Sequence, residues 1–309
     1  MKIVEPFVKQ VINNTPYKKI EYAGRICYKS QDKITDESYI KFVESIAKRG
    51  HLSVLEHESI TIEIPYYFSN EISPFYEFGF FEVSRSDIKH NFYITGNIRA
   101  WKEFFNKCDF FHPFNCELYD TVGIEYEIIF PIRNEFRNVP DYINIIDFNI
   151  MSRREIEENY FPFEEAKKHL SMTYHIRTDR ATSHQIVRHR LSSFSQESQR
   201  YVNYSSDKFD NTIKFILPVE AKELEDEMDG VEEIKRSFLM SEKAYFSLIE
   251  KGVKPETARC VLPNATATEI VMTSNLKQWD RFINLRCDSH AQIDIRELAN
   301  VIRDTIYGG

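Results

Sequence analysis

Nine glycines and five cysteines are few for a chain of 309 residues. Several glycine- and cysteine-containing motifs are absent, and their absence argues against particular nucleotide, hydrolase and metal sites. Neither GxGxxG nor GxxxxGK[ST] occurs, which argues against a Rossmann or P-loop nucleotide site. GxSxG, the turn that carries the nucleophile of many serine hydrolases, is also missing. Because no CxxC pair and no zinc-type spacing occurs, we expect free thiols in a reducing, cytoplasmic setting.

The chain also lacks long apolar runs and positive net charge. No stretch of about 18 apolar residues is present, and the N-terminus has no apolar core of a signal peptide, so we expect neither a membrane span nor export. A net charge of -8 argues against a general nucleic-acid binder. Any basic cluster must therefore be local and suited to a small anion.

Apolar periodicity predicts helices and strands without regular βαβ alternation. Helical spacing is found at 36–50, with Asp36 at the N-cap and Gly50 at the end, and then at 97–105, 238–249, 266–285 and 290–306. Strand patterns are found at 59–64, 170–176 and 215–218. We predict one α+β domain over residues 1–309, with a mixed or antiparallel sheet core flanked by helices and an elaboration at about 66–168. No internal repeat is evident by inspection.

The stretch "RHRLSSFSQESQR" (188–200) gathers arginines, hydroxyls and amides in an otherwise acidic chain. Guanidinium forks with short neutral donors between them suit a phosphate. Each serine taken alone is more simply a loop or capping residue, and an isolated RxR is more simply a solvated surface. Here the flanking "TSHQIV" and "YVNYS" are partly apolar, which favours a buried anion site.

Histidine pairs offer a competing interpretation as metal ligands. The pairs His51 with His57 and His184 with His189 lack the i,i+4 helical spacing of an HExxH site. We therefore predict no metal and expect these histidines to form hydrogen bonds near a sheet edge.

The same thirteen residues resemble the RHR-x7-S signature of the flavin-dependent thymidylate synthases, including an arginine two residues after the serine. Other blocks resemble that family's in the same order: "AGRICYKS" (23–30), "GHLSVLEH" (50–57), "DRATSHQIVRHR" (179–190), "ARCVLP" (258–263) and "NLRCDSHAQ" (284–292). Residues from about 66 to 168 stay outside the resemblance.

The resemblance implies an enzyme that converts dUMP to dTMP. It implies methylenetetrahydrofolate as the carbon donor, bound FAD as the hydride carrier, NADPH as the reductant of the flavin, and a homotetramer whose active sites are shared between subunits. It also implies a non-Rossmann fold, in which side chains rather than a glycine-rich loop hold the flavin.

The resemblance assigns ligand roles to particular positions of this chain. Positions that match dUMP ligands are Gln185, Ile186, Val187, Arg188, Gln196, Glu197, Ser198, Gln199, Arg200, Arg259 and Arg286. Positions that match FAD ligands are His51 and Ser53, implied to come from a neighbouring subunit, and Arg188, His189, Arg190, Gln196, Asn275, Leu276, Lys277 and Arg281. Three departures occur: Ser195-Gln196 where Asn-Glu is common, Lys277 where Arg is common and Arg281 where Asn is common.

Arg286 matches the family's catalytic arginine. A permanently cationic guanidinium can stabilise negative charge on a uracil ring without acting as a base. Cys260 and Cys287 directly follow Arg259 and Arg286, but we expect both to be packing residues rather than nucleophiles. Two alternatives stay open: another flavin-dependent reductase on the same scaffold, and a non-catalytic nucleotide- or RNA-binding protein.

Overall fold

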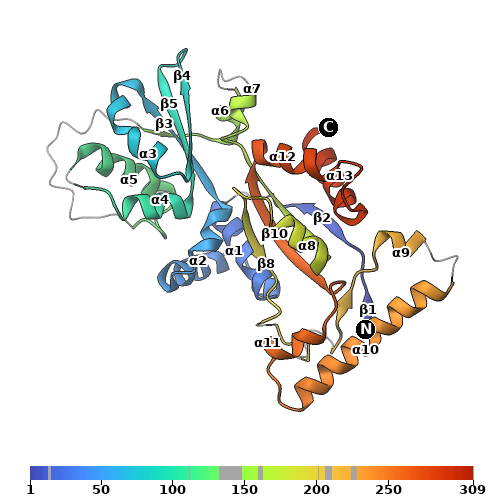
Figure 1. The fold of residues 1–309 in the computed structure, drawn as a ribbon. Helices are drawn as coiled ribbons and strands as arrows, with labels where there is room; N and C mark the ends of the chain where they lie inside the picture. The colour runs from blue at the N-terminus through green and yellow to red at the C-terminus, as the bar shows by residue number, and fades with distance from the viewer. Residues whose placement is uncertain are drawn as a thin grey trace.

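Two four-stranded antiparallel sheets organise the fold (Figure 1). The computed structural model describes residues 1–12, 15–110, 112–131, 148–158, 163–200, 202–205, 211–223 and 228–308. The central sheet has the order β2 (Phe7–Gln10), β7 (Ser171–Asp179), β10 (Ala267–Asn275), β8 (Ser193–Gln196). The outer sheet has the order β4 (Phe81–Ser86), β5 (Asn91–Asn97), β3 (Ser59–Pro65), β6 (Asn149–Ile150). A parallel pair joins β1 (Lys2–Ile3) to β9 (Lys214–Phe215).

Helices surround both sheets and fall into groups along the chain. The first group is α1 (Pro16–Cys27), η1 (Gln31–Lys33), α2 (Ser38–Arg49) and η2 (Leu52–His57). With the outer sheet lie η3 (Tyr66–Glu71), α3 (Ser73–Glu77), α4 (Ile98–Phe105) and α5 (Pro113–Glu125), followed by α6 (Arg153–Glu158) and α7 (Phe163–Ala166). The rest are α8 (Arg180–Ile186), α9 (Val219–Glu223), α10 (Met228–Glu250), α11 (Pro255–Ala258), η8 (Arg259–Val261), α12 (Leu276–Arg286) and α13 (Ile293–Tyr307).

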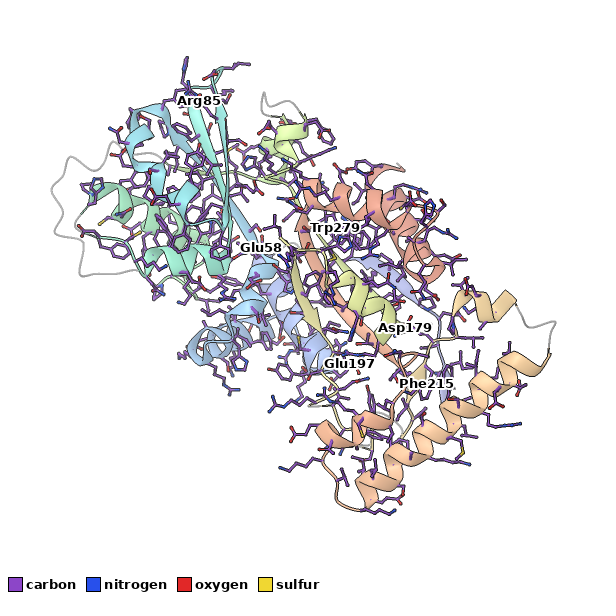
Figure 2. All side chains as sticks on the ribbon, in the orientation of Figure 1. Glu58, Arg85, Asp179, Glu197, Phe215 and Trp279 are labelled. Carbon is purple, nitrogen blue, oxygen red and sulfur yellow. The ribbon has the colours of Figure 1, made fainter. Side chains whose placement is uncertain are left out.

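Each sheet has its own hydrophobic core. One core packs beneath the outer sheet around the aromatic residues of α3, α4 and α5, with Trp101 fully buried. A second packs α12 and α13 on the central sheet around Trp279, which Figure 2 shows in the middle of the molecule. A third surrounds Phe215 next to α10. None of the helices among the described residues combines the length and apolarity of a membrane span.

The predicted α+β class with an antiparallel core is confirmed. The helix expected at 36–50 is α2, and Gly50 ends it in the left-handed conformation with φ of 73°. Its N-cap is Glu37 rather than Asp36, and no side chain caps it. The helices expected at 97–105, 238–249 and 290–306 and the strands expected at 59–64 and 170–176 are also present, whereas the strand expected at 215–218 shortens to Lys214–Phe215.

The helix predicted over 266–285 is wrong in its first half. Residues 267–275 form β10, and only 276–286 form a helix. Strand β10 lies between β7 and β8, and every one of its residues up to Ser274 is buried. A strand buried on both faces has no two-residue alternation, so its apolar run merged with the helical pattern that follows.

Candidate active site

Arg286, at the end of α12, joins two blocks of the sequence that lie far apart. Its Nε donates to Nε2 of His189 at 2.9 Å. Its two terminal nitrogens donate to Gln185, one to the side-chain Oε1 at 3.1 Å and one to the backbone oxygen at 3.2 Å. Three of its five N–H groups therefore orient the guanidinium, and the other two can donate to a ligand.

His189 is held in its neutral form in this cluster. Burial, together with the charge of Arg286, lowers the pKa of His189 to about 4. Because Nε2 accepts from Arg286, it carries no proton. The ring also packs edge-on against Phe282 with centroids 4.7 Å apart. Gln185 is fixed from its other end, since its amide nitrogen donates to Gln292 at 2.6 Å.

The three arginines of the signature have different surroundings. Arg188 and Arg190 are exposed, on the turn that follows α8. Arg200 forms an exposed ion pair with Glu256 at 3.2 Å. Arg259 donates to the backbone oxygen of the same Glu256 at 3.1 Å, so Arg200 and Arg259, both predicted dUMP ligands, contact the same residue of α11.

The middle of the signature is anchored inside the fold. The Gln196 amide donates to the hydroxyls of Ser183, at 2.9 Å, and Thr268, at 3.2 Å. The backbone nitrogen of Ser198 donates to the oxygen of Cys27 at 3.1 Å. Of the remaining predicted dUMP ligands, Ile186, Glu197 and Gln199 are buried, whereas Val187 is exposed where it caps α8.

The predicted FAD ligands outside the signature lie in two regions, around η2 and at the start of α12. Asn275 caps α12 by accepting from the backbone of Gln278 at 2.9 Å, and the next residue, Leu276, is buried. Lys277 is half-buried and Arg281 exposed on the same helix. His51 and Ser53 are exposed on η2, where His51 lies 3.5 Å from the hydroxyl of Tyr28.

A cavity of about 370 Å³ lies between the two sheets next to the signature. The central sheet and its loops line it with Leu191, Ser192, Ser193, Lys168 and Asn275, among others. The outer sheet and η2 line it with Glu56, Phe80, Phe81, Asn97 and Arg99, among others. The segment from about 66 to 168, which sequence reasoning set aside, therefore forms one wall of the cavity.

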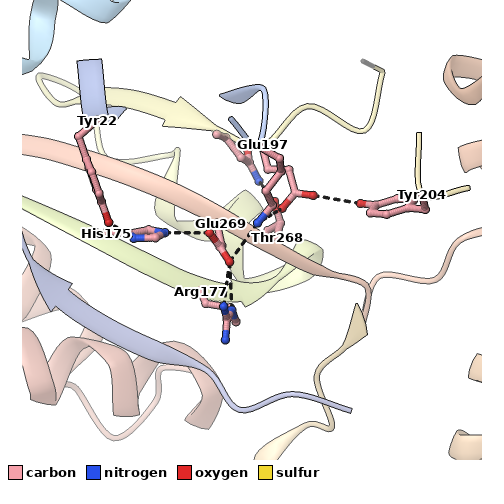
Figure 3. Close-up of polar contacts among 9 residues, drawn as sticks. Tyr22, His175, Arg177, Glu197, Tyr204, Thr268 and Glu269 are labelled. Atoms are coloured by element: carbon pink, nitrogen blue, oxygen red, sulfur yellow. Dashed lines mark hydrogen bonds and ion pairs between the residues drawn. The ribbon is translucent and has the colours of Figure 1, made fainter. Parts of the chain in front are cut away.

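Sequence reasoning missed a buried polar network on β7 and β10 (Figure 3). The hydroxyl of Tyr22 is hydrogen-bonded to Nδ1 of His175 at 2.7 Å, and Nε2 of His175 is hydrogen-bonded to a carboxylate oxygen of Glu269 at 3.1 Å. Glu269 also accepts from Arg177 at 3.0 Å. The signal for such a network was present as charged or titratable residues inside two largely buried strands, His175 and Arg177 on β7 and Glu269 on β10.

Lys29 connects this network to the signature. Its ammonium lies 3.0 Å from both Glu269 and Glu197. Burial would raise the pKa of Glu269, but hydrogen bonds and charge from His175 and Lys29 hold it well below its usual range. Burial raises the pKa of Glu197, whose carboxylate also accepts from Tyr204 at 3.2 Å. The signature is thus tied to the "AGRICYKS" block through one lysine.

The cysteines are free thiols, as predicted. Cys287 is half-buried and packs against the second core, but Cys260 is exposed, so the expectation that it is a packing residue is wrong. It lies on η8, a short turn whose residues are not buried. Within the described residues, no group of three or more His, Cys, Asp or Glu side chains is placed to hold a metal ion.

The chain belongs to the family described as thymidylate synthase complementing protein, whose model matches residues 10–69 and 162–308. The flavin-dependent thymidylate synthase of Geobacter sulfurreducens is 40% identical over 133 residues, covering 43% of this chain and 54% of that protein. The enzyme of the same name from Thermosipho melanesiensis is 31% identical over 192 residues, covering 59% of this chain and 80% of that protein.

The chain thus spans about half the length of several curated relatives it matches. Among solved structures, a UMP/dUMP methylase PolB from Streptomyces cacaoi bound with 5-Br dUMP is similar with a TM-score of 0.43 and 15% identity, covering 100% of this chain and 93% of that one.

Proposed function

We propose that this chain is a flavin-dependent thymidylate synthase, which methylates dUMP to dTMP. The observation that carries the proposal is the Arg286 cluster. Arg286 and Gln185, which match the family's catalytic and substrate positions, are 101 residues apart in the sequence and hydrogen-bonded in the fold. Family membership and the names of the relatives support the same activity.

Arg286 is proposed to stabilise negative charge that develops on the uracil ring as C5 forms its new bond. Hydrogen bonds to Gln185 and to the neutral His189 keep its guanidinium oriented before the substrate arrives, so no reorganisation is needed during the reaction. Arg200 and Arg259 supply two further guanidinium groups at α11, which suit the phosphate of dUMP.

The donor set beside the cavity fits a flavin nucleotide. Exposed guanidinium groups of Arg188 and Arg190 suit a diphosphate, whereas the Asn275 amide and the Ser192 hydroxyl suit neutral oxygens. When bound, a flavin supplies the hydride that the methyl group requires. The chain's own part is to bind and orient the reactants and to exclude water from the buried side of the signature.

Methylenetetrahydrofolate as carbon donor, NADPH as reductant, FAD as the particular flavin, a cytoplasmic location and a homotetramer stay predictions from the resemblance. The test is dTMP formation by the purified chain with dUMP, methylenetetrahydrofolate, FAD and NADPH. Release of tritium from C5 of labelled dUMP distinguishes a synthase from a reductase of other substrates. A chain that binds flavin and oxidises NADPH but neither releases tritium nor forms dTMP contradicts the proposal.

A further inference from the structure

Two pairs of segments in this chain have matching sequences. His57, Ser59 and Thr61 recur as His169, Ser171 and Thr173, each 112 positions later. "TGNIRAWKEF" (95–104) matches "TSNLKQWDRF" (273–282), with identical Thr, Asn, Trp and Phe and with Ile–Arg replaced by Leu–Lys. Residues 57–104 are called here the first copy, and residues 169–282 the second copy.

The matching residues form the same contacts in both copies. Thr61 pairs with Thr95 in register and shares a hydrogen bond of 2.6 Å, and Thr173 pairs with Thr273 at 2.8 Å. The indole nitrogen of Trp101 donates to the oxygen of Ile60 at 3.4 Å. The equivalent bond runs from Trp279 to Met172 at 3.1 Å. In both copies an asparagine caps the helix that follows the strand: Asn97 caps α4, and Asn275 caps α12.

The sheets match strand by strand as well. The outer order β4-β5-β3-β6 corresponds to the central order β8-β10-β7-β2. Strands β6 and β2 are the matching edges, since Met151 donates to the oxygen of Thr61 at 2.8 Å and Val11 to that of Thr173 at 2.9 Å. The strand that precedes each copy therefore pairs with the other copy's sheet, so the edge strands are exchanged.

The copies contact one another reciprocally. His57 of the first copy bonds to Thr273 of the second at 2.8 Å, and His169 of the second bonds to Thr95 of the first at 2.7 Å. A contact of residue i with j repeated as j with i is the mark of a twofold arrangement. The cavity described above lies on this axis, because Ser59 and Ser171, Thr95 and Thr273, and Asn97 and Asn275 line it as equivalent pairs.

We propose that the chain is an internal duplication whose two copies form, within one polypeptide, the composite ligand site that the family resemblance assigns to neighbouring subunits. The duplication rests on the matching sequences, the strand register and the hydrogen bonds, and does not depend on the proposed function. The identity of the ligand, a flavin nucleotide, rests on the proposed function. The first copy then forms one wall of the site, and the family model matches only the start of it, up to residue 69, before it resumes at residue 162.

The two walls differ in charge at equivalent positions. Glu56, Arg99 and Glu103 line the cavity and have a net charge of -1. The equivalent positions beside the second copy's wall have a net charge of +3: Lys168 lines the cavity, and Lys277 and Arg281 lie on α12 outside the lining. Arg99 is paired with two carboxylates, Glu56 at 2.7 Å and Glu103 at 2.6 Å, whereas Lys168 is paired with one, Glu165, at 2.6 Å. Phosphates should therefore bind on the second copy's side only.

The two walls also differ in polarity. Leu191, Ser192 and Ser193 of the second copy line the same cavity as Phe80, Phe81 and Glu82 beside and within the first copy's sheet. Hydroxyls on one side and phenyl rings on the other suit a ligand that is polar at one end and aromatic at the other. We infer one flavin per chain, with its phosphates toward the second copy and its ring toward Phe80.

The test is FAD titration of the purified full-length chain, followed by flavin fluorescence and absorbance. The wild-type chain should bind one FAD per chain. Lys277→Ala should raise the Kd by about ten-fold as a charge-assisted phosphate contact is lost. Arg99→Ala at the equivalent position should have a smaller effect, about two-fold, because Arg99 lines the cavity but its guanidinium is already paired with Glu56 and Glu103. Phe80→Ala should raise the Kd by about three- to ten-fold, since ring stacking is lost.

Tyr76→Ala is the control for Phe80→Ala, because Tyr76 is 61% exposed and Phe80 65% exposed in the same part of the chain, but only Phe80 lines the cavity. Thermal unfolding of all four variants checks that folding is intact. Two flavins per chain, equal effects of Lys277→Ala and Arg99→Ala, or no effect of Phe80→Ala each overturn the composite site. A wild-type chain that binds no FAD overturns the composite site and the proposed function together.

Discussion

The first and second copies keep the same strand–helix framework, but most residues of the predicted active site lie in or beside the second. In the second copy, β10 and α12 carry Asn275 and Lys277, and α12 continues beyond the copy to Arg286. In the first copy, α4 ends at Phe105, before the position that would match Arg286. The shared residues make the internal hydrogen bonds, and several of them also line the cavity, whereas charged residues in and beside the cavity differ between the copies. Framework and chemistry can therefore change independently.

The largest expected effect tests whether the frameworks are equivalent. Trp101→Ala and Trp279→Ala should each destabilise the fold by about 3–5 kcal/mol, because both indoles are fully buried and each leaves a cavity when removed. Urea unfolding measures the change. If either variant fails to fold, Trp→Phe at both positions keeps most of the volume and removes only the bond to Ile60 or Met172. A large effect in one copy and none in the other would break the equivalence.

The second prediction tests whether the chemistry belongs to one copy. Arg286→Ala should lose about 3–4 kcal/mol of transition-state stabilisation, a hundred-fold or more in rate. Arg286→Lys should also be impaired, since an ammonium cannot reproduce the bonds to both Gln185 and His189. The measurement is the rate of dTMP formation at saturating substrates. Cys287→Ala is the neighbouring control and should keep most activity; a dead Cys287→Ala beside an active Arg286→Ala would refute the role of the arginine.

The third prediction uses the histidines that connect the copies. Burial lowers the pKa of His57 to about 3 and that of His169 to about 4. The unfolded chain binds these protons near pH 6.5, so stability is complete above that pH and falls as the pH drops toward 4. His169 alone should cost on the order of 3 kcal/mol by pH 4.

Urea unfolding between pH 7.5 and pH 4.5 measures this loss. His169→Gln keeps a polar side chain beside Thr95 but cannot titrate, so its stability should depend less steeply on pH than that of the wild type. An unchanged slope would mean that the contact between the copies does not depend on the neutral ring.

The smallest expected effect separates the two helix caps. Asn97→Ala and Asn275→Ala each remove a side-chain bond to the first turn of a helix and should cost about 1 kcal/mol. Thermal unfolding should show similar shifts. Flavin titration should distinguish them, with weaker binding for Asn275→Ala than for Asn97→Ala. Similar losses of flavin affinity would mean that the first copy holds the ligand as strongly as the second.

Local patterns predicted many of the elements correctly. Helix α2 and strand β3 have one buried face, so their periodicity shows in the sequence. Strand β10 is buried on both faces and was read as helix. The repeat was missed because its matches are short and separated by 112 and 178 residues, and they become significant only when the register of the sheets is known.

The candidate site was predictable where a motif could be matched and not where it depends on packing. Gln185, His189 and Arg286 were named from motifs, and the fold brings them into contact. Lys29 was not singled out, because its position in a motif does not indicate that it forms ion pairs with Glu197 and Glu269 in the folded chain. Long-range partners of buried charges follow from topology, which no local pattern contains.

The exchanged edge strands also set an order of events during synthesis. Strand β2 is made at the start of the chain, but its partner β7 emerges about 160 residues later. At ribosomal rates of about 5–20 residues per second, β2 stays unpaired for roughly ten to thirty seconds until β7 has been synthesised. The outer sheet likewise lacks its edge until β6 is made. An unpaired edge invites pairing with other chains, so nascent chains of this protein should depend on chaperones until the second copy has left the ribosome.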